Sequence, residues 1–298
     1  MRIAFIGLGE AATAIISGWD IRHTKSITAF DIKSDNSDTI DEIQLRAQNL
    51  NIKLVFKLAD ALSCADIVFS TVTADQAAVV AQSASELLKP NTLFLDLNSC
   101  APSTKINSAN IMQERMVRYV DVAVMEPVYP KQHKVPLLIS GDWSKDAEKV
   151  FRSLSMCCRV VEGKVGKASS VKMVRSIMVK GLEALTAECA LAASAADVIT
   201  EVFPSLREGH PKLDVEKRAI YNFERSMKHG MRRAAELDEV AMMVADLGLP
   251  NNLSLAAAHW QRIIARSTDH EFMERYQCDL GSLLDGLLPR IRQTIETN

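Results

Sequence analysis

"RIAFIGLGEAATAIISGW", residues 2–19, places an apolar, strand-like run directly before a glycine-rich turn and a stretch of small and apolar residues. Gly7, Gly9 and Ala12 follow the GxGxxG/A spacing. The first glycine permits a tight turn, the second lets a backbone approach a pyrophosphate, and the small third residue lets a helix pack closely on the strand. The helix N-terminus then faces the phosphates. The residues expected to line a bound dinucleotide here are Gly7, Gly9, Glu10, Ala11 and Ala12.

Further β-rich runs follow this unit, separated by helical stretches: "SITAFD", "IKLVF", "DIVFSTV", "TLFLDLN", "VRYVDVAV", "PLLISG" and "CRVVEG". Such alternation predicts a parallel sheet with helices on both faces. After "CRVVEG" the β-rich runs stop, and helical patterns continue with breaks at 203–214, 246–252 and near Pro289. The predicted fold class is therefore α/β: a doubly wound Rossmann domain over 1–163, followed by an all-α domain over 164–298.

Asp31 ends the second β-rich run, where an acidic side chain can accept hydrogen bonds from the ribose 2′-hydroxyl of a dinucleotide and would repel a 2′-phosphate. This position favours NAD as the cofactor. Lys25 and Lys33 lie close to Asp31 in sequence, and a neighbouring cation could accommodate the extra phosphate of NADP. Both cofactors therefore stay open, with NAD preferred.

The composition is that of a globular protein, with 298 residues, 48% hydrophobic and 24% charged. A formal net charge of -2, with basic residues scattered among acidic ones, gives no electrostatic reason to expect nucleic acid. No apolar run approaches the roughly 20 residues that cross a bilayer, and no signal segment precedes the first strand. The cysteines form no CxxC pair, and no metal-ligand spacing occurs. We expect a cytoplasmic protein that acts on a small molecule, without a metal or a membrane.

A mostly apolar helix is predicted from about Ala168 toward Asp197, and one of its faces carries Lys172, Arg175, Ser176 and Lys180. A solvated polar edge would be the simplest explanation of these residues. A helix of this length could also form one wall of a ligand-binding cleft. The rest of the chain has to decide between the two interpretations.

The chain resembles the β-hydroxyacid dehydrogenase family, related to 3-hydroxyisobutyrate and 6-phosphogluconate dehydrogenases. The segments that carry the resemblance are "GLGEAA" with Asp31, "TVTADQA", "DLNSCAPST", "DVAVMEPV" and "GKASSVKMVRS". Their order and spacing cover essentially the whole chain. The stretch "KHGMRRAAELDEVAMMVADLGLP" is similar to the variant helical domain of a phosphogluconate-dehydrogenase-like branch.

The resemblance implies a role for the basic helix. Lys172 matches the family's general acid/base, which takes the proton of the substrate hydroxyl, and Arg175 would lower its pKa or hold a substrate carboxylate. Ser176 stands where the family usually has an asparagine that bonds the substrate. Lys180 alone is better explained as a surface lysine.

Three loops at strand ends complete the implied site. Asn98 and Ser99 match donors to the substrate, although an ordinary Asn/Ser turn before Pro102 would also explain them. Met125 and Glu126 replace the small residues that the family usually has at this position, and imply a reshaped pocket. The residues implied to pack against the cofactor are Thr71, Val72 and Thr73.

The resulting expectation is an NAD(P)-dependent oxidoreductase that transfers a hydride from the β-hydroxyl of a small 3-hydroxy acid. An imine reductase-like enzyme is an alternative, although such enzymes usually lack the lysine. A non-catalytic nucleotide-sensing protein is a second alternative, favoured by Ser176 and Glu126. The helical domain is expected to form a homodimer. His229 and the two arginines after it, Arg232 and Arg233, fit such an interface better than a substrate site.

Overall fold

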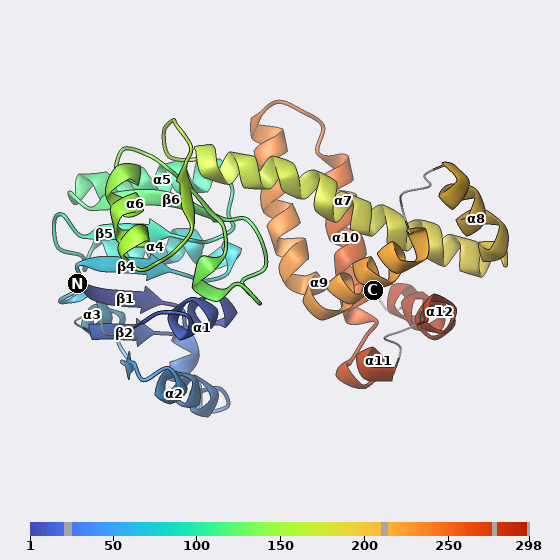
Figure 1. Cartoon of the computed structure of the whole chain (residues 1–298), viewed down its shortest axis with the longest axis horizontal. Helices are drawn as coiled ribbons and strands as arrows, with labels where there is room; N and C mark the ends of the chain where they lie inside the picture. Colours follow the sequence, from blue (N-terminus) through green and yellow to red (C-terminus); the bar gives the residue numbers. More distant parts are fainter. Residues whose placement is uncertain (21–25, 210–213, 276–278, 297–298) are drawn as a thin grey trace. The chain divides into compact units, whose positions relative to one another are not determined.

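The computed structural model describes residues 1–20, 26–209, 214–275 and 279–296 (Figure 1). Lys25, predicted to bear on cofactor choice, lies outside the described residues. By contacts between Cα atoms the chain divides into two compact units, Met1–Met173 and Val174–Asn298. The boundary predicted at residue 163 marks the end of the β-rich region. The compact units divide about two helical turns into the next helix instead, because the start of that helix is bonded to the sheet.

The first unit contains an eight-stranded sheet in the order β3-β2-β1-β4-β5-β6-β7-β8. Its strands are β1 (Arg2–Ile6), β2 (Ser26–Phe30), β3 (Lys53–Leu54), β4 (Ile67–Ser70), β5 (Leu93–Asp96), β6 (Arg118–Val124), β7 (Leu137–Ser140) and β8 (Cys158–Val160). Each falls within a predicted β-rich run, so the Rossmann prediction is confirmed. The order reverses beside β1, which is where doubly wound sheets bind ligands.

One strand departs from the predicted parallel arrangement: β7 pairs with β6 in the antiparallel sense. The connection between them, residues 125–136, contains only the short 3₁₀ helix η4 (Gln132–Lys134). A parallel return needs a longer crossover, usually with an α-helix. The chain therefore turns back along β6 instead of crossing the sheet.

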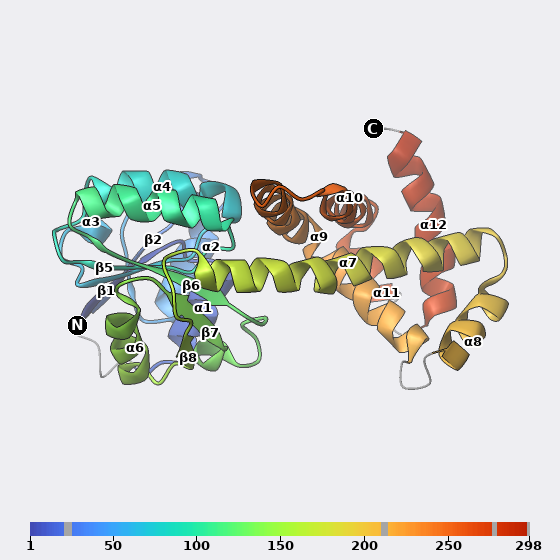
Figure 2. The ribbon, with the colours of Figure 1, turned by 90° about the horizontal axis from the view of Figure 1, so that it is seen from above.

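Two layers of helices cover the two faces of the sheet (Figure 2). The first layer is α1 (Glu10–Ser17), α2 (Ile40–Asn49) and α6 (Ser144–Ser153), and the second is α3 (Leu58–Leu62), α4 (Ala77–Ser85) and α5 (Pro102–Glu114). Ile3 and Phe5 of β1 pack toward the first layer, whereas Ala4 and Ile6 pack toward the second. A strand buried on both faces explains why "RIAFI" is almost continuously apolar.

The second unit is helical, as predicted. It contains most of α7 (Lys167–Ala195), with α8 (Ile199–Gly209), α9 (Val215–Asp246), α10 (Asn252–Arg266), α11 (His270–Arg275) and α12 (Leu280–Glu296). Asp214 caps α9 by accepting the Lys217 N–H at 3.0 Å. The core of this unit includes Phe223, Ile264 and Leu284, each at most 1% exposed.

The predicted helix breaks are confirmed at 246–252, between α9 and α10, and wrong near Pro289. Pro289 lies inside α12, which continues to Glu296. Proline removes one intrahelical hydrogen bond, but the buried Leu287 and Ile291 on either side still pack into the core and hold the helix together. Likewise, α8 runs through Pro204 to Gly209, so no break begins at 203, and residues 210–213 of the predicted break lie outside the described residues. Among the described residues, no helix is long and apolar enough to cross a membrane.

Candidate active site

The glycine turn after β1 has a conformation that only glycine adopts easily. Gly7 has φ +91°, and a Cβ atom placed there would lie 2.6 Å from the carbonyl oxygen of Thr71. The Gly7 N–H donates to the carbonyl of Phe30 at 2.8 Å, and the Thr71 hydroxyl donates to the carbonyl of Gly7 at 2.9 Å. The turn is thereby bonded to the ends of both neighbouring strands, β2 and β4.

Gly9 faces open space at the N-terminus of α1. A Cβ atom at Gly9 would meet nothing within 4 Å, and no side chain caps the helix. The first-turn N–H groups of α1 are thus available to an anion. Ala12, fully buried, lets α1 pack closely on the sheet, and Ala11 packs partly buried against the same core. The site fits the pyrophosphate of a dinucleotide. Glu10 is exposed in this first turn, where its carboxylate favours the helix but would repel a phosphate.

Asp31 lies beside the glycine turn, as the cofactor prediction requires. It is 9% exposed, and its two carboxylate oxygens accept the N–H of Leu8 at 2.7 Å and of Lys33 at 2.9 Å. Arg46 of α2 donates to the Leu8 carbonyl at 3.1 Å. These bonds hold the Asp31 carboxylate at the end of β2, with lone pairs left for a ribose hydroxyl.

The loop after β4 contacts the loop after β5. Asn98, 3% exposed, accepts the Val72 N–H at 2.7 Å through its side-chain oxygen and donates to the Ser70 hydroxyl at 2.9 Å. Thr73 is exposed, and its hydroxyl helps Gln76 to lower the pKa of Asp75. Asn98 therefore connects the two loops, and its contact with substrate stays a prediction.

Lys172 and Ser99, predicted from separate segments, are brought together. Lys172 Nζ donates to the Ser99 hydroxyl, and both side chains are partly buried. Lys172 comes from the second turn of α7, and Ser99 from the loop after β5. The first unit therefore holds an amine and a hydroxyl in contact. The hydroxyl belongs to the loop after β5, which Asn98 bonds to Ser70 and Val72.

In the same unit, a row of buried polar residues crosses four strands of the sheet. Ser70, Asp96, Asp121 and Ser140 are partners in register on β4, β5, β6 and β7, and none is more than 1% exposed. Lys105 of α5, fully buried, places its Nζ 2.7 Å from Asp96 Oδ1 and 3.9 Å from Asp121 Oδ1. The lysine therefore lies close to both carboxylates.

The charges of this row shift the titration of its neighbours. Burial alone would lower the pKa of Lys105, but Asp96, Cys100 and Asp121 together outweigh it, and the pKa is raised. Burial also raises the pKa of Tyr119 well above its usual value, reinforced by Asp96, to which the phenol donates at 2.5 Å. Lys105 and Tyr119 are therefore both protonated at neutral pH.

Asp121 also bonds the start of α7. Its carboxylate accepts the N–H groups of Gly166 at 3.1 Å and Ser169 at 3.0 Å, and the Ser169 hydroxyl at 2.5 Å. Ser140 donates to Asp121 at 3.0 Å and accepts the Ala168 N–H at 3.0 Å. These residues satisfy N–H groups that have no partner within the helix.

This network is not evident from the sequence alone. A signal was present, because Asp96 and Asp121 interrupt the apolar runs "LFLDL" and "YVDVAV". A carboxylate inside a buried strand must be paired. Its partner, Lys105, has no distinguishing feature in the sequence.

Met125 and Glu126 follow directly after the end of β6. Met125 packs against Ala123, Leu138 and Ala168, and Glu126 is exposed and pairs with Lys131 at 2.5 Å. The Glu126 carboxylate thus has a cationic partner from its own loop.

The second unit holds the other predicted residues. Arg175 is exposed, and Ser176 is 9% exposed. The expectation of a surface lysine at 180 is wrong: Lys180 is 5% exposed and pairs with Glu236. Burial lowers the pKa of Lys180, although Glu236 opposes this. This unit also pairs the buried Arg233 with Glu183.

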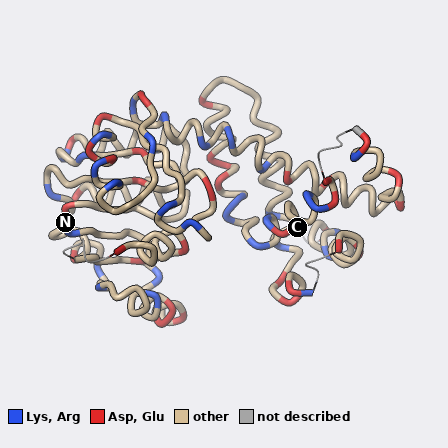
Figure 3. The backbone as a smooth tube through the Cα atoms, in the orientation of Figure 1, with Lys and Arg blue, Asp and Glu red and all other residues tan. Residues whose placement is uncertain are grey.

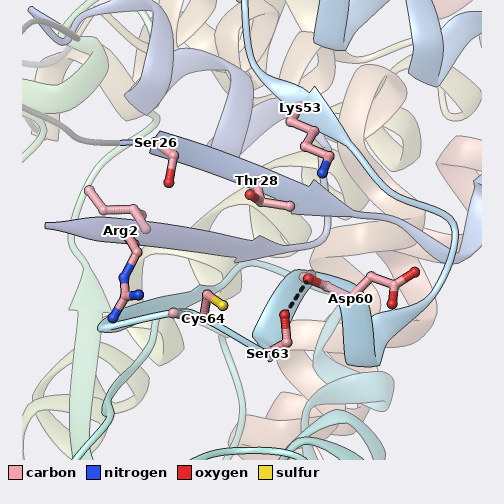
Figure 4. A pocket seen from close by; sticks show the side chains of 10 residues that line it. Arg2, Ser26, Thr28, Lys53, Asp60, Ser63 and Cys64 are labelled. Carbon is pink, nitrogen blue, oxygen red and sulfur yellow. Dashed lines mark hydrogen bonds between the residues drawn. The ribbon is translucent and has the colours of Figure 1, made fainter.

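A small pocket of about 170 Å³ lies elsewhere on the sheet, and Figure 4 shows it from close by. Its lining includes Arg2, Ser26 and Lys53, the first residues of β1, β2 and β3. The glycine turn follows the opposite end of β1. This pocket therefore contains none of the predicted site residues.

Charges of both signs are distributed along the described chain, without a block of one sign (Figure 3). Within residues 1–20, 26–209, 214–275 and 279–296, no group of three or more His, Cys, Asp or Glu side chains could hold a metal ion.

Comparison with known proteins agrees with this geometry. Residues 2–163 match the NAD binding domain of 6-phosphogluconate dehydrogenase, and residues 193–264 match a domain of unknown function, DUF1932. The solved structure of a conserved hypothetical protein from Sinorhizobium meliloti 1021 is 33% identical, with TM-score 0.73, over 99% of this chain and 96% of that one.

Two further proteins extend the comparison. An uncharacterized 28.5 kDa protein from Methanothermus fervidus is 27% identical over 82% of this chain and 91% of its own. The 3-hydroxyisobutyrate dehydrogenase of Mycobacterium tuberculosis has the same fold, with 16% identity, TM-score 0.67, and coverage of 96% of this chain and 98% of that one.

Substitutions at the two loop glycines should affect different properties: Gly7 the stability of the fold, and Gly9 the binding of the cofactor. Gly7→Ala should lower the free energy of unfolding by about 1–3 kcal/mol, because a Cβ there is strained and clashes with Thr71. Gly9→Ala should change it by less than about 0.5 kcal/mol. The same Gly9→Ala change should weaken NAD(P) binding by roughly tenfold or more, since its methyl group would occupy the phosphate space. Urea unfolding and calorimetric titration measure the two effects; unaltered affinity in Gly9→Ala would exclude this phosphate site.

The buried network predicts loss of stability in alkali. Folding raises the pKa of Lys105 above its usual 10.5 and that of Tyr119 well above its usual 10.0. The two groups therefore contribute fully to the free energy of unfolding below these usual values. That contribution is lost as the pH rises through the higher pKa values of the folded state. Tyr119→Phe should lower the free energy of unfolding by about 1 kcal/mol at pH 7, and this free energy should fall less steeply above pH 10 than in the wild type. Denaturant titrations at several pH values, with the exposed Tyr221→Phe as control, test this. An identical alkaline decline in Tyr119→Phe would contradict it.

Proposed function

The chain belongs to the family defined by the NAD binding domain of 6-phosphogluconate dehydrogenase, and we propose that it is an NAD(P)-dependent dehydrogenase acting on the β-hydroxyl of a small 3-hydroxy acid. The observation that supports this most directly is the contact between Lys172 and Ser99. An amine from α7 and a hydroxyl from the loop after β5 meet there, and that loop is connected to the glycine turn through Asn98 and Thr71.

Oxidation of a secondary alcohol requires a group that takes the hydroxyl proton. The nicotinamide, when bound, accepts the hydride. In the proposed reaction the neutral Lys172 amine accepts the proton at Nζ, and the Ser99 hydroxyl orients the substrate by hydrogen bonding to its hydroxyl or carboxylate. Arg175, also on α7, is the proposed partner of the carboxylate. Ser176, in place of the usual asparagine, would leave more room beside the substrate.

Cofactor choice in this proposal depends on Asp31. Its carboxylate is held beside the glycine turn by Leu8 and Lys33, so a 2′-phosphate would meet a negative charge. We therefore propose NAD as the preferred cofactor. Lys33 is exposed and is a nearby cation that could offset part of the repulsion in NADP.

Turnover tests the role of Lys172. Purified protein with NAD or NADP and a panel of 3-hydroxy acids should reduce the nicotinamide, and Lys172→Ala should lower kcat by roughly 100-fold or more, as for loss of a general base. Lys167→Ala, an exposed lysine in the first turn of the same helix, is the matched control and should retain activity.

The other outcomes separate the alternatives. Equal loss of activity in both variants would contradict a specific role for Lys172. Reduction of cyclic imines by NAD(P)H, with no oxidation of hydroxy acids, would favour the imine reductase. Binding of NAD(P) without turnover on either panel would favour a nucleotide sensor.

We also propose that the protein is a homodimer. Val174, Met178, Leu182 and Leu185 of α7 are 54%, 64%, 43% and 64% exposed, at spacings that place them along one side of the helix. An exposed apolar stripe of this kind is typical of an interaction surface. A second copy of the chain is the proposed partner.

Light scattering measures this directly. The protein should have twice the mass of one chain at micromolar concentration, and Met178→Glu should shift it toward the monomer, because a carboxylate would be buried in the interface. The exposed Met231→Glu, on α9, is the control. A wild-type monomer would contradict the proposal.

A further inference from the structure

Asp96 and Asp121 are two buried carboxylates on neighbouring strands, and their charges have to be compensated within the fold. They are partners in register on β5 and β6, and their side chains are 1% and 0% exposed. Like charges directly opposite each other on neighbouring strands destabilise a sheet, and burial increases the cost. Lys105, itself fully buried, is the cation near both. The three groups therefore depend on one another.

The Asp96 side of this group controls the loop that carries Ser99. Asp96 Oδ1 accepts the Asn98 N–H at 2.9 Å, and Lys105 donates to the Asp96 main-chain carbonyl at 2.7 Å. Asn98 is bonded in turn to Ser70 and to the N–H of Val72. Hydrogen bonds thus fix the backbone and the side chain of Asn98, the residue immediately before Ser99.

The Asp121 side controls the helix that carries Lys172. Asp121 accepts the Ser169 N–H and hydroxyl, and the Gly166 N–H. Lys172 follows Ser169 by three residues, so it lies about one turn further along the same side of α7. A change at the bonds to Asp121 would therefore move the Lys172 amine.

We propose that Asp96, Lys105 and Asp121 form one positioning unit that holds Ser99 and Lys172 in contact. The three residues act through Asn98 and Ser169 and do not touch the substrate. The catalytic meaning of this unit depends on the proposed function, whereas the coupling itself does not. Lys105 sets the distance between the Asp96 side and the Asp121 side of this unit, because it bonds to Asp96 and lies 3.9 Å from Asp121.

Ser169→Ala is the most informative variant. It removes one bond to Asp121 and leaves the charges and the helix N–H in place. Lys105→Met would leave two buried carboxylates without their cation and could prevent folding. Ser170→Ala is the matched control, since the Ser170 hydroxyl donates to the carbonyl of Gly166 and makes no bond to Asp121.

The first measurement needs no substrate. Trace acetylation with acetic anhydride, followed by mass spectrometry, gives the reactivity of Lys172 at each pH, with the exposed Lys167 as internal reference. Ser169→Ala should change the Lys172 reactivity on the order of threefold, the lower end of couplings within one network, and should shift its pH profile. Ser170→Ala should leave both unchanged.

A double-mutant cycle shows whether the effect passes through Ser99. Ser99→Ala removes the contact itself, so Ser169→Ala should add little in that background. Full additivity, or wild-type reactivity in Ser169→Ala, would overturn the positioning unit.

Kinetics provides a second measurement. Ser169→Ala should lower kcat about tenfold with the KM for NAD unchanged, as expected when a reacting group is misplaced. An equal change in Ser170→Ala would overturn the proposal in favour of a general effect on α7. If the wild-type protein turned over no hydroxy acid, the proposed function would fail, while the labelling experiment would still decide the positioning unit.

Discussion

Two buried carboxylates on adjacent strands, with one lysine between them, determine how this protein presents its candidate active site. Asp96 and Asp121 face each other in register, and Lys105 compensates their charges where no water is available. Because each carboxylate also accepts backbone N–H groups, the ion pairs do more than balance charge. One end of the network holds the loop after β5, and the other holds the first turns of α7. A network of this kind is valuable only when every member is satisfied, since one unpaired carboxylate would cost more than an apolar replacement.

The cofactor site has a different physical basis, which is backbone geometry. Gly7 turns the chain with a positive φ in a space closed by the Thr71 carbonyl, and Gly9 leaves the N-terminus of α1 open. These requirements come from sterics, and the helix N-terminus adds a partial positive charge. The buried Asp31 adds a carboxylate beside the glycine turn, which is the basis of the proposed preference for NAD. Asn98 joins the loop after β5 to the loop after β4, because its side-chain oxygen accepts the Val72 N–H.

The second unit uses buried charge differently. Lys180 with Glu236, and Arg233 with Glu183, pair residues of α7 with residues of α9 inside a helical core. Such pairs specify which helix faces which, because any other register would leave a charge buried without a partner. The opposite, exposed side of α7 is apolar at Met178 and Leu185. One helix thus carries a charged face toward its own unit and an apolar face toward solvent, which is the reason for proposing a second copy there.

The sequence by itself determined the strands, the glycine turn and the place of Asp31, because these features depend on local patterns of apolar periodicity and glycine spacing. Lys172 and Ser99 were selected through the family resemblance, which depends on the order of several motifs along the chain. Local patterns failed at Pro289, where packing of Leu287 and Ile291 outweighs the cost of proline, and at β7, whose direction depends on the connection before it. Only the tertiary structure decided that Lys105 lies between Asp96 and Asp121 and that Lys180 is buried. Partners of buried charges are far apart in the chain, so no local pattern contains them; they become visible only when the sheet register and the helix packing bring the groups together.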